Sequence, residues 1–152
     1  MNISDQIKSL PSIKMASVVF IPESTTFIVH VDEDMLRKFG CTYTSSKEDR
    51  IDELIGILSQ ARGHEHPNHE ASEVRHGIFL KLIDDTEIKL VLGKSQDSYW
   101  GEFSTPQGLK KTFFDADDPF ITKLYRWAAD SDLSYKQGYS DSRCDEYLKT
   151  RK

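Results

Sequence analysis

The sequence VRHGIFLKLIDDTEIKLVL, residues 74–92, decides the fold class because it contains two alternating runs around a turn. The apolar side chains of the first run, such as Ile78 and Leu80, and of the second run, such as Leu90, occupy every other position. A period of two places them on one face of a strand. The pair Asp84-Asp85 marks the turn. The stretch therefore predicts a β-hairpin with one buried face.

Similar patterns extend in both directions from this hairpin. Residues 99–104 and 109–114 predict a second hairpin around the turn Thr105-Pro-Gln-Gly. Upstream, residues 13–21 and 25–31 are rich in β-branched and aromatic side chains, with Pro, Glu and Ser between them. Turn residues between two such runs favour a third hairpin.

Two longer segments have the periodicity of amphipathic helices. Residues 47–62 carry apolar side chains at spacings of three and four, and Ser46 is the expected N-cap. Residues 118–130 follow an acidic stretch and place Pro119 in the first turn, where proline is favoured. Shorter helices are expected at residues 3–10 and at 35–39, where Gly40 is the stop.

Strands joined by short turns, with helices between and after them, are typical of an antiparallel α+β fold. We therefore expect one domain over residues 1–152, with a mainly antiparallel sheet of about five or six strands. The amphipathic helices 47–62 and 118–130 are expected to pack on it. Residues 131–152 are expected to form a polar C-terminal tail with a short helix at 141–149.

The composition indicates a folded domain with an acidic balance. The 152 residues include 20 Lys and Arg against 25 Asp and Glu, a formal net charge of −5. Nucleic acids and anionic membranes are bound by clustered basic side chains, which this chain lacks. We therefore expect no direct nucleic-acid contact and no membrane contact, and the charge favours a basic protein partner.

The cysteines and the N-terminus bear on the compartment. Cys41 and Cys144 are far apart and match no metal-binding or redox spacing, so we expect buried thiols and no disulfide framework. The first ten residues lack the basic start and apolar run of a secretory signal. No window approaches the roughly 18 apolar residues of a membrane span. The expected location is the cytoplasm.

The segment from Asp84 to Asp118 has a local excess of acidic side chains. It contains eight acidic residues against four lysines. Complementary charge steers association, so such a surface favours a basic partner. The predicted partner-binding residues are Asp84, Asp85, Glu87, Glu102, Asp115, Asp117 and Asp118.

Aromatic side chains accompany these carboxylates, and two interpretations stay open. Trp100, Phe103, Phe113 and Phe114 are either interface anchors ringed by charge or core residues beneath the last helix.

Four of the five histidines, His64, His66, His69 and His76, fall within thirteen residues. Such spacings can bring imidazoles to one divalent ion, so a metal-binding protein or metal-dependent enzyme is the alternative hypothesis. The chain has no His-Glu-x-x-His motif, and Pro67 interrupts any helix across the cluster. A polar loop followed by a strand bearing His76 is the competing interpretation. We expect no cofactor.

The chain contains no Gly-x-Ser-x-Gly or other recognisable catalytic motif, which favours binding over catalysis. In size, acidic charge and lack of catalytic motifs it is similar to the small immunity proteins that bacteria keep against secreted toxins. That similarity involves the whole chain and no particular motif, so it assigns no residue roles. It implies a protein that neutralises a basic toxin or enzyme by occlusion.

Overall fold

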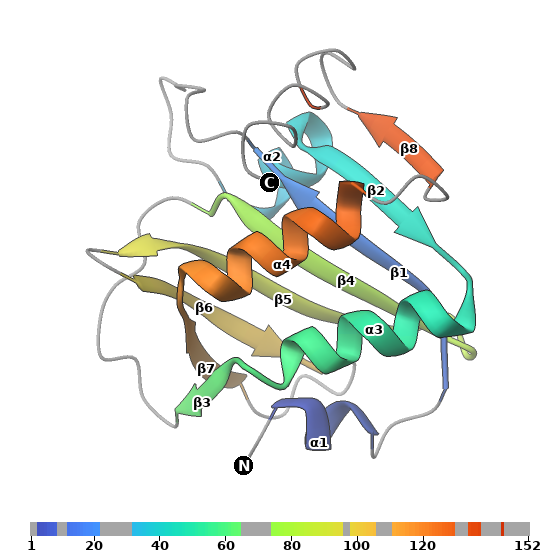
Figure 1. Cartoon of the computed structure of the whole chain (residues 1–152), viewed down its shortest axis with the longest axis horizontal. Coiled ribbons are helices and arrows are strands. Elements are labelled where there is room, and N and C mark those ends of the chain that lie inside the picture. Colours follow the sequence, from blue (N-terminus) through green and yellow to red (C-terminus); the bar gives the residue numbers. More distant parts are fainter. Residues whose placement is uncertain are drawn as a thin grey trace.

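The computed structural model describes residues 3–8, 12–21, 32–64, 74–95, 98–105, 111–129, 134–137 and 144. These residues form four helices and eight strands (Figure 1). The helices are α1 (Ile3–Lys8), α2 (Glu33–Phe39), α3 (Glu48–Leu58) and α4 (Asp118–Ala129). The strands are β1 (Ile13–Phe20), β2 (Cys41–Ser45), β3 (Arg62–His64), β4 (His76–Leu82), β5 (Glu87–Ser95), β6 (Ser98–Ser104), β7 (Lys111–Ala116) and β8 (Ser134–Gln137).

All of these strands belong to one antiparallel sheet, in the order β3-β7-β6-β5-β4-β1-β2-β8. The predicted α+β class is confirmed, and the sheet has more strands than the five or six expected. The β4–β5 and β6–β7 hairpins lie where the alternating patterns predict them. Both are local structures, in which the turn and the strands are contiguous in sequence.

β1 lies between β2 and β4 rather than in a hairpin with residues 25–31. Phe20, at the end of β1, is opposite Cys41 on one side and His76 on the other. Both edges of this end of the strand are therefore occupied, and the predicted hairpin is wrong. Residues 25–31 lie outside the described part of the chain.

The sequence patterns do not predict β2, β3 and β8. These strands have five, three and four residues. Short segments like these carry too few positions for a periodic signal, and their conformation depends on pairing with strands distant in sequence. β8 occupies part of the predicted polar tail, whose predicted helix at 141–149 lies outside the described residues except at Cys144.

α3 and α4 lie side by side on one face of the sheet (Figure 1). We call this the inner face. Their buried residues, including Leu54 and Trp127, pack with inner-face side chains such as Phe103 in the main hydrophobic core. The helices are also joined by reciprocal hydrogen bonds. Trp127 Nε1 donates to the Arg50 carbonyl at 2.8 Å, and Arg50 Nη2 donates to the Trp127 carbonyl at 3.0 Å.

The two predicted amphipathic helices are present as α3 and α4. α3 ends at Leu58, four residues before the predicted end, because the chain turns there into β3. Its N-cap is Lys47 without a side-chain hydrogen bond, so the expected cap at Ser46 is wrong. α4 starts as predicted, and the Asp117 carboxylate accepts a hydrogen bond from the Phe120 amide at 3.1 Å.

α2 packs against the opposite face of the sheet, which we call the outer face. A second hydrophobic cluster forms there from Val19, Ile21, Leu36 and Phe79. Gly40 ends the helix as predicted, at a point where a Cβ atom would lie 2.4 Å from the Leu36 carbonyl oxygen. The Arg37 guanidinium lies 3.7 Å above the Phe79 ring, a cation–π arrangement.

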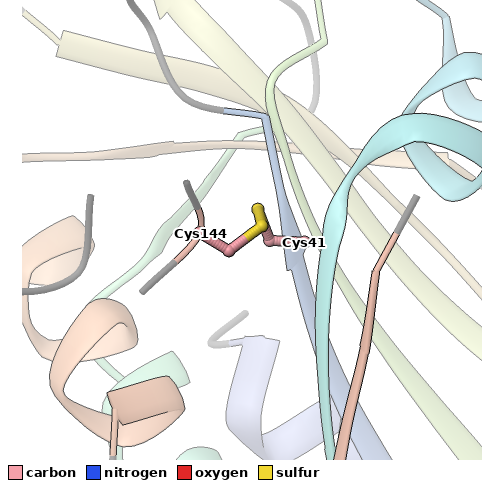
Figure 2. The surroundings of a disulfide bond; sticks show 2 residues. All are labelled: Cys41 and Cys144. Atoms are coloured by element: carbon pink, nitrogen blue, oxygen red, sulfur yellow. A yellow bond between two sulfur atoms is a disulfide. The ribbon is translucent and has the colours of Figure 1, made fainter. Parts of the chain in front are cut away.

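Cys41 and Cys144 form a disulfide, with their Cα atoms 5.8 Å apart (Figure 2). Both residues are fully buried. The expectation of two separate thiols is wrong, because the antiparallel β2–β8 pairing places Gln137 opposite Cys41 and so returns the chain close to it. Among the described helices, none has the length and apolar character needed to span a bilayer.

Candidate functional site

The β4–β5 turn is the most conspicuous surface feature of the predicted acidic segment. Ile83 has 62% of its surface exposed and is the one large hydrophobic residue that is exposed in the described part of the chain. Asp84 and Asp85 follow it, both exposed. The turn thus presents an apolar side chain next to two carboxylates, the combination that interfaces use as an anchor within a charged surround.

Several hydrogen bonds hold this turn in one conformation. The Ile83 amide donates to the Ser12 carbonyl at 2.9 Å, which ties the turn to the start of β1. Asp84 Oδ1 accepts from the Thr86 amide at 3.0 Å and from the Thr86 hydroxyl at 2.5 Å. Asp85 has a φ of 69° and forms an ion pair with Lys14. An aspartate is among the few residues that accept this left-handed conformation.

Both carboxylates are stabilised in the charged form. The pKa of Asp84 is lowered mainly by the hydrogen bond from the Thr86 side chain, and that of Asp85 by its hydrogen bond from Lys14. Each hydrogen bond favours the ionised carboxylate over the neutral acid. The turn therefore carries two negative charges at neutral pH.

A shallow groove of about 500 Å³ begins beside this turn, on the outer face between α2 and strands β5 and β6. Glu33, Glu87 and Glu102 supply its carboxylates, and Lys89 lies among them. Lys89 Nζ is 3.1 Å from a Glu33 carboxylate oxygen. The groove is lined by Glu33, Thr86, Glu87, Lys89, Val91, Glu102, Ser104 and Thr105.

Part of the predicted acidic excess is neutralised by cations from elsewhere in the chain. Arg37 Nη2 lies 2.5 Å from a Glu87 carboxylate oxygen, and Arg37 also pairs with Glu33. Asp115 is only 5% exposed and accepts from Arg62 Nη2 at 2.6 Å. Asp115 is therefore a structural residue that a partner does not reach in this conformation.

The other predicted acidic residues lie at the far end of the sheet. Asp117 caps α4, and Asp118 is exposed in its first turn. The strand register places Ala116 opposite Tyr99, at the end of β5 away from Glu87. The nine residues of β5 span roughly 26 Å at about 3.3 Å per residue. Thus the structure places Glu87 and Glu102 in one groove that begins beside Asp84 and Asp85, whereas Asp117 and Asp118 lie at the opposite end of the sheet from that turn.

The aromatic residues near Trp100 are mostly interior. Phe103 and Phe114 are fully buried in the core beneath α3 and α4. Trp100 is 6% exposed and Phe113 is half-buried, and both lie on the outer face of the sheet. The core interpretation therefore holds for Phe103 and Phe114, and none of the four is an exposed anchor.

The histidines of the alternative hypothesis are spread across the sheet. His76 is buried on the inner face, where its Nε2 lies 2.5 Å from the Tyr125 hydroxyl. His64 is in edge strand β3, and three strands separate β3 from β4. At about 4.8 Å per strand the two backbones lie roughly 19 Å apart, too far to share one ion. His66 and His69 lie outside the described residues. No cluster of three potential metal ligands occurs within the described ranges.

A second groove, of about 630 Å³, runs between α1, the start of β1 and α3. Its floor includes Ile7, Ile13 and Ile51, and its walls carry charges of both signs. Sequence reasoning missed this groove, as it missed the contributions of Ile83 and Glu33 to the acidic surface. The sequence did contain a signal for Ile83, because an apolar residue directly beside a predicted turn can be exposed. No local signal places α2 against β5.

Comparisons with protein-family models, characterised proteins and solved structures found no match to this chain. The candidate site therefore stands on its own geometry.

Proposed function

We propose that the chain is an acidic protein-binding module that neutralises a basic partner by occlusion, in the manner of a bacterial toxin-immunity protein. The partner is a basic toxin or enzyme, and nucleic acid and membrane are not bound directly. The cytoplasm is the proposed compartment. Binding rather than catalysis is the proposed activity.

The observation that carries this proposal is the rigid β4–β5 turn, with exposed Ile83 beside ionised Asp84 and Asp85. A turn held by hydrogen bonds to Ser12 and Thr86 loses little conformational entropy when it binds. An apolar side chain there can enter a pocket on the partner, while the carboxylates contact lysine or arginine around that pocket.

The proposed contact surface extends from the turn into the adjacent groove, with Glu87, Glu102 and Glu33. Glu87 and Glu33 are paired with Arg37, so a basic partner must compete with that arginine. The surface is accordingly expected to steer association more than it adds affinity. Asp115 is not part of it, and Asp117 and Asp118 belong to a separate end of the molecule.

The test starts with the tagged protein, used at low salt to capture its partner from its native cells, followed by mass spectrometry. The purified partner is then used in binding kinetics. The variant Ile83→Ala should speed dissociation about tenfold, the 1.4 kcal/mol scale of an interface anchor. The double variant Asp84→Asn/Glu102→Gln should slow association severalfold at low salt and have little effect at high salt.

A matched control removes the same charge elsewhere. Asp117 and Asp118 are both exposed and lie at the end of the sheet away from the turn. Asparagine at position 117 can still cap α4, so Asp117→Asn/Asp118→Asn should leave both rates close to wild type. Equal slowing by the two double variants would mean that only net charge matters. Unchanged kinetics for all three variants would refute this contact surface.

A further inference from the structure

The disulfide lies at a particular place in the sheet, where β8 covers the edge of β2. β8 is the last strand in the sheet order, and among the described residues it pairs only with β2. Cys41 is both the residue opposite Gln137 in this pairing and the partner of Cys144 in the disulfide. The covalent bond and the end of the edge strand are therefore attached to the same residue of β2.

A four-residue edge strand is a weak structural unit. It has backbone pairing on one side only, and such strands open at a lower free energy than the centre of a sheet. β8 forms four residue pairs with β2, whereas the adjacent β1–β2 pairing has five and the β1–β4 pairing, further into the sheet, has seven. The retention of β8 on the sheet therefore depends on the contacts that hold its flanking segments close to β2.

We propose that the Cys41–Cys144 disulfide is a redox-sensitive clamp that holds β8 on β2, and that its reduction releases β8 and uncovers the edge of β2. The clamp does not depend on the proposed partner-binding function. It fits the proposed compartment, since disulfides in the cytosol of mesophiles are usually transient or redox-sensing.

The reductant is a dithiol. One of its thiolates attacks a sulfur of the Cys41–Cys144 bond to form a mixed disulfide, and its second thiol then displaces the remaining cysteine. The dithiol is oxidised to a disulfide by two electrons. Cys41 and Cys144 are reduced, and each sulfur ends with a proton. Because both cysteines are fully buried, the attack must follow a local opening of the structure.

The size of the effect follows from chain tethering. With the disulfide intact, a detached β8 remains in a loop of about fifteen residues, closed by the end of α4 at Ala129 and by Cys144. Closing a loop of that length is worth a factor of about 100 in an equilibrium constant. Reduction should therefore raise the opening equilibrium of β8 by about 100-fold.

Hydrogen exchange followed by mass spectrometry tests this directly. The protein is compared in oxidised and in reduced dithiothreitol, and its intact mass verifies the gain of two hydrogens. Amides of β8, and those of β2 that face it, should exchange about 100-fold faster after reduction. Amides of β4 and β5, in the centre of the sheet, should keep their protection and serve as an internal control.

Two results would overturn the clamp. Unchanged exchange in β2 and β8 after verified reduction would show that the disulfide does not hold the edge strand. Loss of protection in β4 and β5 as well would show that it supports the whole domain. The variant Cys144→Ser should exchange rapidly at β2 and β8 in either form of dithiothreitol. If that variant does not fold, the reduced wild-type protein decides the question.

Discussion

Gly101 in β6 is a position where one added methyl group should strongly destabilise the sheet. A Cβ atom there would lie 2.1 Å from the Val91 carbonyl oxygen and 2.5 and 2.8 Å from Leu92 Cβ and Cα. Contacts below about 3 Å force movement, and here the obstacles are mainly the backbone of β5, which is itself paired with β4. Overpacking of this kind costs about 1–3 kcal/mol, and we expect Gly101→Ala near the upper end.

The matched control is Gly56→Ala in α3. A Cβ atom at Gly56 would meet nothing within 4 Å, and the residue is exposed on the helix. Alanine is favoured over glycine in a helix by about 0.5–1 kcal/mol, so this variant should be more stable than wild type.

Thermal unfolding followed by circular dichroism measures both changes. In a domain of this size, 1 kcal/mol corresponds to a Tm shift of about 2–4 °C. Gly101→Ala should therefore melt about 6–12 °C below wild type, and Gly56→Ala about 1–4 °C above it. A Gly101→Ala protein that melts within 2 °C of wild type, with Gly56→Ala raised as expected, would refute the close approach of β5 and β6.

Two further predictions concern the helix pair and the turn. Trp127→Phe removes the donor to the buried Arg50 carbonyl, so it should lower the free energy of unfolding, measured by urea titration, by about 1–3 kcal/mol. A loss below about 0.5 kcal/mol would contradict a stabilising role of the hydrogen bonds between α3 and α4. Thr86→Val removes the hydroxyl donor that lowers the pKa of Asp84, so NMR titration should show that pKa rising toward its usual value of 3.8. The pKa of Asp85, which is lowered mainly by its hydrogen bond from Lys14, should stay lowered. Because their folded-state pKa values are lowered, the carboxylates of Asp84 and Asp85 stabilise the folded protein above about pH 4. This contribution is lost as the pH falls through the folded-state pKa values. A turn that is more stable at about pH 3 than at about pH 6 would contradict this expectation.

The acidic surface shows how a count of charges along the sequence differs from a charge distribution in space. The eight acidic residues between Asp84 and Asp118 have only four lysines within their own segment. Lys14, Arg37 and Arg62 come from 50 or more residues away to pair with Asp85, Glu87 and Asp115. The local excess that motivated the binding hypothesis is thus smaller in the folded protein, and its exposed part is concentrated at the β4–β5 turn.

What the sequence determined by itself was the local structure. The alternating runs around Asp84-Asp85 and around Thr105 predicted two hairpins, because a strand, a turn and its partner strand are adjacent along the chain. The apolar stripe of α3 and the acidic start of α4 predicted both core helices within a few residues. These signals depend on neighbouring residues only, and so they can be read without knowing the rest of the fold.

Only the tertiary structure decided how these units are combined. It placed β1 between β2 and β4, added the short strands β3 and β8, and set α2 against the outer face. It also joined Cys41 to Cys144 across 103 residues and divided the predicted acidic residues between two ends of the sheet. Each of these arrangements depends on pairing and burial between distant segments, for which the free energy arises only once the whole sheet is assembled.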